Sequence, residues 1–143
     1  MSVFVVDASV VIKWFVPEIH SEGARRLLET TGHYVAPDLL FPEVGNTIWK
    51  KVRRDELSAP QGRELVADIS TVAVETVPAR SLFEDAYGVA IATGLTVYDA
   101  TYVALAVRLE TKVITADERL VRTAASNRMI AGHVQHVQEA SWR

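Results

Sequence analysis

The sequence contains no cysteine among its 143 residues. This absence excludes a disulfide framework, a cysteine-based zinc site and a thiol nucleophile. No apolar run approaches the roughly 20 residues that a membrane-spanning helix needs. The opening residues 1–7 also lack the basic start of a secretory signal peptide. We therefore expect a soluble, cytoplasmic protein with no membrane partner.

The sequence has no excess of basic residues either. Its 15 Lys and Arg stand against 18 Asp and Glu, for a formal net charge of -3. This balance excludes a generally basic nucleic-acid-binding body but allows a local basic patch. We find no internal repeat, low-complexity tract or Gly/Ser linker, and a chain of this length buries about 70% of its unfolded surface. We expect a single domain over residues 1–143.

Short β-branched runs alternate with longer helical stretches along the chain. This alternation predicts an α/β fold in which helices cover a parallel sheet. The expected strands cover residues 3–6, 34–36, 72–77, 112–115 and 134–137, and the expected helices cover residues 10–15, 21–30, 38–54, 60–70, 82–93, 99–110 and 117–127. We expect Ser9, Ser81, Asp99 and Asp117 to start four of these helices.

Several acidic residues fall at positions where a parallel sheet places its ligands. Asp7 follows the first strand and Asp117 follows the fourth, so both should lie at the carboxyl edge of the sheet. Asp99 begins a stretch that is apolar on nearly its whole circumference. Such a helix is buried, so this carboxylate should face the interior or a cleft. Glu43 and Asn46 lie three residues apart on one helix face.

Each acid taken alone also has an ordinary structural explanation. Aspartates such as Asp99 and Asp117 commonly cap helices, and Asp7 can bond its own backbone in a turn. Glu43 shares a helix face with Lys50, as a solvated acid would. Carboxylates that converge within about 5 Å would instead repel by roughly 3 kcal/mol per pair at an effective dielectric near 20. That cost requires a cation or raised pKa values, and an all-carboxylate set suits Mg²⁺ or Mn²⁺.

Four segments, taken in order, resemble the motifs of a known family. They are residues 3–9 (VFVVDAS), 42–46 (PEVGN), 94–106 (GLTVYDATYVALA) and 115–120 (TADERL). In this order and spacing they are similar to the successive motifs of PIN-domain proteins, and more narrowly to those of the VapC-type toxins of bacterial and archaeal toxin–antitoxin pairs. The resemblance extends from Val3 to Leu120.

The resemblance implies a three-layer α/β/α sandwich with a central parallel sheet. It also implies a metal-dependent endoribonuclease that cleaves single-stranded RNA with Mg²⁺ or Mn²⁺. The implied partners are the RNA substrate, a cognate VapB-like antitoxin and a second copy of the chain in a homodimer.

The resemblance further assigns roles to individual residues. The acidic quartet of the family corresponds to Asp7, Glu43, Asp99 and Asp117. Asp7, Asp99 and Asp117 are expected to hold the metal directly or through water, and Glu43 is expected to ligate it or to orient the attacking water. The family's small polar positions beside the quartet, which would orient carboxylates or waters, correspond to Ser9, Asn46 and Thr115.

A basic cluster lies at the end of the helix expected to carry Glu43. It consists of Lys50, Lys51, Arg53 and Arg54. These cations can simply complement the helix dipole on a solvated face, or they can contact RNA phosphates and make binding salt-dependent.

The aromatic and histidine side chains have mostly structural explanations. Trp14, Phe15 and Trp49 are expected in the core, with contact to a partner peptide as the alternative for Trp49. His133 and His136 would face opposite sides of a strand and so form no metal pair, and His20 and His33 are expected in loops. The stretch beyond Arg128 carries no motif of the family, and we assign it no function.

Other functions remain to be weighed against a toxin ribonuclease. A PIN nuclease can act in RNA processing or on DNA flaps, and a PIN fold can serve as a non-catalytic RNA- or protein-binding module. A phosphoacceptor receiver domain is also small, acidic and α/β, but it needs an aspartate on the third strand and a lysine on the last. Residues 72–77 contain no aspartate and residues 134–137 contain no lysine, which disfavours that class.

Overall fold

A five-stranded parallel sheet forms the centre of the molecule. The computed structural model describes residues 2–30 and 32–139. The strand order in the sheet is β3-β2-β1-β4-β5, and all neighbouring strands are parallel. The strands are β1 (Val3–Val6), β2 (His33–Pro37), β3 (Glu75–Val77), β4 (Val113–Thr115) and β5 (Val134–His136).

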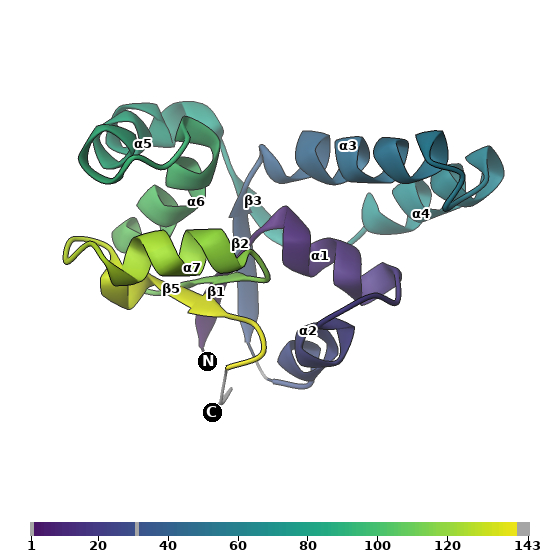
Figure 1. The fold of residues 1–143 in the computed structure, drawn as a ribbon, viewed down its shortest axis with the longest axis horizontal. Helices are drawn as coiled ribbons and strands as arrows, with labels where there is room; N and C mark the ends of the chain where they lie inside the picture. Colours follow the sequence, from purple (N-terminus) through teal and green to yellow (C-terminus); the bar gives the residue numbers. More distant parts are fainter. Residues whose placement is uncertain (1, 31, 140–143) are drawn as a thin grey trace.

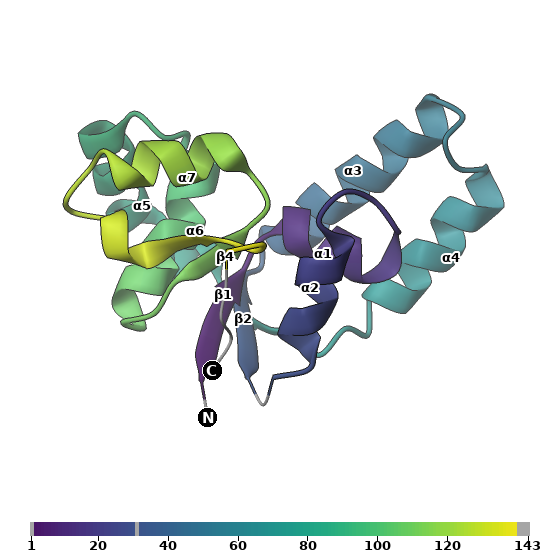
Figure 2. The same ribbon diagram turned by 60° about the horizontal axis from the view of Figure 1, so that its bottom comes forward.

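Helices cover both faces of this sheet, as Figures 1 and 2 show. They are α1 (Ala8–Phe15), α2 (Ser21–Leu28), α3 (Leu40–Arg53), α4 (Ala59–Ile69), α5 (Ala79–Thr93), α6 (Val97–Arg108) and α7 (Glu118–Ala125), followed by a short 3₁₀ helix, Ala131–His133. The connections from β1 to β3 move towards one edge of the sheet, and those from β3 to β5 move towards the other. Because such crossovers are right-handed, α1–α4 lie on one face and α5–α7 on the other (Figure 2). The α/β/α sandwich is confirmed.

The core lies where the central strands meet α6. Val5 and Val6 of β1 and Val113 and Ile114 of β4 are fully buried, as expected for strands covered on both faces. Residues 100–106 of α6 are all buried as well, which confirms the expectation from the apolar circumference of this helix.

The N-terminus of α1 differs from the prediction. Asp7, not Ser9, is the N-cap, and its side chain accepts the backbone amide of Val10. The hydroxyl of Ser9 is instead used in a contact with Asp7 itself. Asp117 caps α7, as predicted, by accepting the amides of Arg119 and Leu120.

Two further helices also begin earlier than predicted. Thr96 caps α6 by accepting the amide of Asp99 at 3.1 Å, so Asp99 is the third helical residue instead of the first. The helix α5 begins at Ala79, directly after Pro78, so Ser81 lies inside its first turn. In both cases the sequence offers two possible helix starts three residues apart, and the helix begins at the earlier one.

The helix pair α3 and α4 extends away from the sheet (Figures 1 and 2). Trp49 lies on this pair and is 53% exposed, so the prediction of a core position for it is wrong. The α4 helix packs over Val52 and Ile48 of α3 at Gly62, which leaves the Trp49 ring outside. The guanidinium of Arg53 covers the ring at 5.0 Å from its centroid.

The other aromatic and histidine predictions have mixed outcomes. Trp14 and Phe15 pack against the core, as predicted. His33 was expected in a loop but begins β2. Its Nε2 lies 2.6 Å from a carboxylate oxygen of Glu75 on the neighbouring strand β3. Glu75 is in register with Val35, and His33 lies two residues earlier on the same face of β2.

No single helix among the described residues is long and apolar enough to cross a membrane. The helices α5 and α6 meet that requirement only when taken together, and they are bent by 111° relative to each other.

Candidate functional site

The pairing of β1 with β4 brings two of the predicted acids to one place. Val6 is in register with Ile114, and the backbone amide of Asp7 donates to the carbonyl of Ile114 at 3.5 Å. Asp7 therefore lies beside Thr115, two residues before Asp117. The chain leaves β1 and β4 towards opposite faces of the sheet at this point, and α/β sheets form their ligand-binding crevice where this happens.

Ser9 and Thr115 join the two strand ends by hydrogen bonds. The Ser9 hydroxyl donates to Oδ1 of Asp7 at 2.6 Å and accepts the amide of Ala116 at 2.9 Å. The Thr115 hydroxyl accepts the amide of Asp117 at 3.0 Å. Both residues thus lie next to the acids that they were predicted to orient.

The third and fourth acids come from α6 and α3. Asp99 lies in the first turn of α6, and Glu43 in the first turn of α3. Tyr102, one turn after Asp99, donates its hydroxyl proton to Oε1 of Glu43 at 2.6 Å and is 2% exposed. Asn46, which was predicted to orient carboxylates or waters, is exposed on α3.

Tyr102 was not among the predicted site residues. It lies within the segment 94–106 that resembles the family, at a spacing of three from Asp99, and residues at that spacing share a helix face. This spacing is the signal in the sequence that could have identified it.

The pKa values show that the acids act on one another through Asp99. The pKa of Asp7 is raised to about 6, chiefly by burial and also by the charge of Asp99, and hydrogen bonds from Ser9 and Thr115 oppose the rise. Burial also raises the pKa of Glu43, and the charge of Asp99 adds to this.

Asp99 itself responds in the same way. Burial raises its pKa, the charge of Asp117 adds to the effect, and Arg119 opposes it. Asp99 is thus electrostatically coupled to each of the other three acids. We call Asp7, Glu43, Asp99 and Asp117 the acidic quartet.

The chemistry of the acidic quartet fits a divalent cation. Asp7 and Asp117 do cap helices, but the backbone amides that they accept all bond to Oδ1. Capping therefore leaves Oδ2 of each aspartate available to a ligand. Carboxylates that are buried and repel one another become more stable when a cation is added. A donor set made only of carboxylate oxygens suits hard ions such as Mg²⁺ and Mn²⁺.

The basic cluster lies outside this group. It is at the far end of α3, about 10–16 Å along the helix from Glu43 at 1.5 Å per residue. Lys51 is engaged with Glu18 at 3.1 Å, and Arg53 covers Trp49. Lys50 and Arg54 are exposed.

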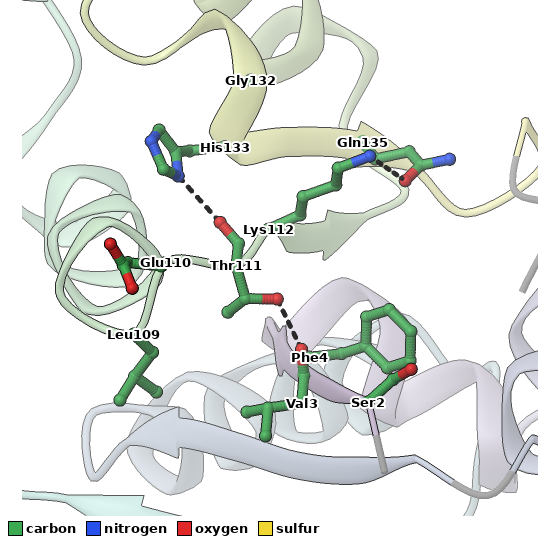
Figure 3. A pocket seen from close by; sticks show the side chains of 10 residues that line it. All are labelled: Ser2, Val3, Phe4, Leu109, Glu110, Thr111, Lys112, Gly132, His133 and Gln135. Carbon is green, nitrogen blue, oxygen red and sulfur yellow. Dashed lines mark hydrogen bonds between the residues drawn. The ribbon is translucent and has the colours of Figure 1, made fainter. Parts of the chain in front are cut away.

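A pocket of about 510 Å³ lies at the opposite edge of the sheet (Figure 3). It is lined by the start of β1, by residues 109–112 before β4 and by the chain leading into β5. His133 contacts the Thr111 carbonyl there at 2.8 Å, and Lys112 donates to Gln135. None of the acidic quartet lines this pocket.

Comparison with known proteins identifies the class to which the chain belongs. The sequence pattern of the PIN domain matches residues 4–126, and the chain belongs to the PIN domain family. Within that family it is homologous to VapC ribonucleases. It is 35% identical to Ribonuclease VapC3 of Pyrobaculum aerophilum over 118 residues, which cover 81% of this chain and 90% of that protein.

Solved structures show the same fold. The crystal structure of PAE2754 from Pyrobaculum aerophilum superposes with a TM-score of 0.69 at 21% identity, covering 96% of this chain and 85% of that chain. VapBC2 of Rickettsia felis, crystallised with a DNA fragment from its promoter, gives a TM-score of 0.59 at 9% identity, with 94% and 98% covered. Nucleases of the PIN and VapC type typically use divalent metals.

Proposed function

We propose that this VapC-type PIN protein is a metal-dependent endoribonuclease that cleaves phosphodiester bonds of single-stranded RNA, and that it is the toxin of a VapBC-type toxin–antitoxin pair. The observation that carries the proposal is that Asp99 interacts electrostatically with Asp7, Glu43 and Asp117 beside the ends of β1 and β4. Homology to VapC ribonucleases supports the reaction and the substrate class.

The cofactor in this proposal is Mg²⁺ or Mn²⁺. Asp7, Asp99 and Asp117 would hold it directly or through water, and Glu43 would either ligate it or orient the attacking water. The chemistry that such an ion supplies is Lewis-acid activation of a phosphodiester towards attack by water.

The remaining residues of the site keep the carboxylates in place. Ser9 holds Asp7 through the 2.6 Å bond to its Oδ1, and Thr115 holds the backbone at Asp117. Tyr102 holds Glu43, so that its second oxygen, Oε2, can receive a proton from water or bind the ion. These contacts reduce the reorganisation that the reaction would otherwise require.

Two protein partners complete the proposal. The first is a cognate antitoxin of the VapB type, supported by related toxins that have been crystallised in toxin–antitoxin complexes. The second is another copy of the chain. Phe83, Tyr87 and Ile91 recur every four residues on the exposed face of α5, and a contiguous apolar patch on a surface marks an interaction site.

Cleavage of labelled single-stranded RNA tests the proposed reaction. Wild type should cut with Mg²⁺ or Mn²⁺ and stop when EDTA is added, and Asp7→Asn should be inactive in every metal. Asp68→Asn, which changes an exposed aspartate on α4, is the matched control and should cut normally. If protein freed of any copurified antitoxin leaves RNA intact with both metals, it is a non-catalytic binding module instead.

Growth experiments separate the toxin from a PIN nuclease of RNA processing. Induced expression of wild type should arrest growth, and co-expression of the antitoxin should relieve the arrest. Asp7→Asn should be harmless at the same protein level. Metal-dependent cleavage in vitro without growth arrest would favour a role in RNA processing.

A further inference from the structure

A second group of ligand-bearing side chains lies beside the acidic quartet. His20 precedes α2, Glu118 is the first residue of α7, and His136 ends β5. One ligand atom from each residue lies within 4.8 Å of the others. The two imidazole rings meet edge to face, with centroids 4.8 Å apart. We call these three residues the His–Glu cluster.

Two ring nitrogens of the His–Glu cluster are buried without a partner. They are Nδ1 of His20 and Nε2 of His136, and no other buried side-chain nitrogen or oxygen in the described part of the chain lacks a hydrogen bond. His136 is 7% exposed. Burying a polar atom without a hydrogen-bond partner is costly, so two such nitrogens in one cluster point to a site that a bound ligand would satisfy.

We propose that the His–Glu cluster binds a zinc-like transition-metal ion through Nδ1 of His20, Nε2 of His136 and a carboxylate oxygen of Glu118. Two imidazoles and one carboxylate form a familiar set of zinc ligands, which leaves a fourth position for water. Bond lengths near 2.1 Å place tetrahedral ligands about 3.4 Å apart.

The His–Glu cluster differs from the acidic quartet in the ion that it prefers. Imidazole nitrogen suits zinc and other borderline metals, whereas an all-carboxylate set suits Mg²⁺ and Mn²⁺. The two groups meet at the start of α7, where Glu118 directly follows Asp117. An ion on Glu118 would join this helix end to β5 and to the connection between α1 and α2, and so restrain the backbone that positions Asp117.

Binding has a structural consequence at the end of β5. The backbone amide of Gln138 donates to Nδ1 of His136 at 3.1 Å, which places the proton of the neutral ring on Nε2. A metal on Nε2 requires the proton to move to Nδ1, so the Gln138 amide must turn away. Zinc should therefore change the environment of residues 137–139 as well as that of the two rings.

Zinc binding is best measured where the acidic quartet cannot contribute. Asp99→Asn protein, stripped with a chelator and held in excess Mg²⁺, is titrated with Zn²⁺ against a chromophoric zinc indicator. We expect one Zn²⁺ per chain. Since losing even an outer partner of a ligand costs about 10–100-fold in affinity, His20→Gln and Glu118→Gln should each weaken binding at least tenfold.

Matched controls and a second readout make the result decisive. His33→Gln and Glu84→Gln, which change residues outside the cluster, should bind Zn²⁺ as the parent does. Zinc should shift the ¹⁵N resonances of both cluster imidazoles and the amide of Gln138, whatever the nuclease activity. The proposal would be overturned if the Asp99→Asn protein bound no stoichiometric Zn²⁺. It would also be overturned if His20→Gln and Glu118→Gln, made in that protein, bound Zn²⁺ as tightly as it does. A protein that cannot cleave RNA but still binds Zn²⁺ would count against the proposed role of the acidic quartet, and not against the His–Glu cluster.

Discussion

Asp7 has to be charged to bind a cation, although it is buried where a charge is costly. Its pKa rises from 3.8 to about 6, so between these values the folded protein binds more protons than the unfolded chain. Stability therefore falls as pH rises through this window, and it stays lower above pH 6. Two pKa units correspond to about 3 kcal/mol.

Asp7→Asn should therefore stabilise the metal-free protein at pH 8. Asparagine retains an oxygen that can accept from Ser9 and Val10 but has no charge to bury. In EDTA at pH 8, we expect the free energy of unfolding of the variant to exceed that of wild type by up to about 3 kcal/mol. This difference should become smaller towards pH 4. Urea unfolding at both pH values measures it. A gap that does not depend on pH would show that the ionisation of Asp7 is not responsible.

Mg²⁺ should reverse this order of stability. An ion that binds only the folded state stabilises it by mass action, and Asp7→Asn removes one of its ligands. Saturating Mg²⁺ should raise the melting temperature of wild type at pH 8 and leave that of Asp7→Asn nearly unchanged. Equal shifts in the two proteins would place the ion elsewhere.

Tyr102 contacts the acidic quartet through its hydrogen bond to Glu43. Tyr102→Phe keeps the ring in the core but removes the donor to Oε1 of Glu43, so we expect single-turnover RNA cleavage to slow about tenfold or more. Tyr98→Phe, which changes an exposed ring on the same helix, should cut at the wild-type rate. An unchanged rate in a folded Tyr102→Phe variant would show that Glu43 needs no such support.

The acids could be placed from the sequence more readily than the side chains that contact them. Asp7 and Asp117 could be placed because each follows a strand, and parallel strands end at a common edge. The contact of Tyr102 with Glu43 depends on how α6 lies relative to α3, which no local pattern specifies. The same is true of His20 and His136, which are 116 positions apart and meet only because β5 pairs with β4.

At the scale of elements, the exposed end of α3 carries the cations that were predicted to contact RNA phosphates. Lys50 and Arg54 are exposed there, whereas Lys51 is held by Glu18. Each lost phosphate contact lowers the salt dependence of single-strand binding by about 0.7 in the log–log slope. The double variant Lys50→Ala/Arg54→Ala should therefore bind RNA more weakly, with a slope smaller by about 1.4 if both make such contacts.

Binding is measured with the inactive Asp7→Asn protein across a salt series. Lys112→Ala, which removes a cation at the opposite edge of the sheet, should leave the slope unchanged. An unaltered slope in the double variant would show that Lys50 and Arg54 do not contact RNA phosphates and only complement the helix dipole on a solvated face.

Element boundaries were harder to predict than the existence of the elements. Every expected strand and helix is present, because the alternation of apolar runs is strong. The starts of α1, α5 and α6 were misplaced, since Asp7, Pro78 and Thr96 each precede another residue that could begin a helix. Tertiary contacts decide among such candidates. Ser9, for example, serves the site instead of the helix end.

At the scale of the whole molecule, α5 has two faces with different roles. Leu82, Ala86 and Val89 are buried against the rest of the protein, whereas Phe83, Tyr87 and Ile91 face outward from the same helix. Three large apolar side chains on one exposed face are costly to leave in water, and a second copy of the chain related by a two-fold axis would bury the same stripe on both subunits.

We therefore expect wild type to be a dimer and the double variant Tyr87→Arg/Ile91→Arg to be a monomer. Two arginines on each subunit would bring four like charges together across a two-fold interface, and such contacts cost several kcal/mol. Light scattering after size exclusion measures the mass, and Ile19→Arg is the control, because Ile19 is equally exposed but lies on the opposite face of the sheet. If the double variant stays dimeric, the subunits meet through another surface. If it is monomeric and still cleaves RNA, each subunit carries a complete acidic quartet.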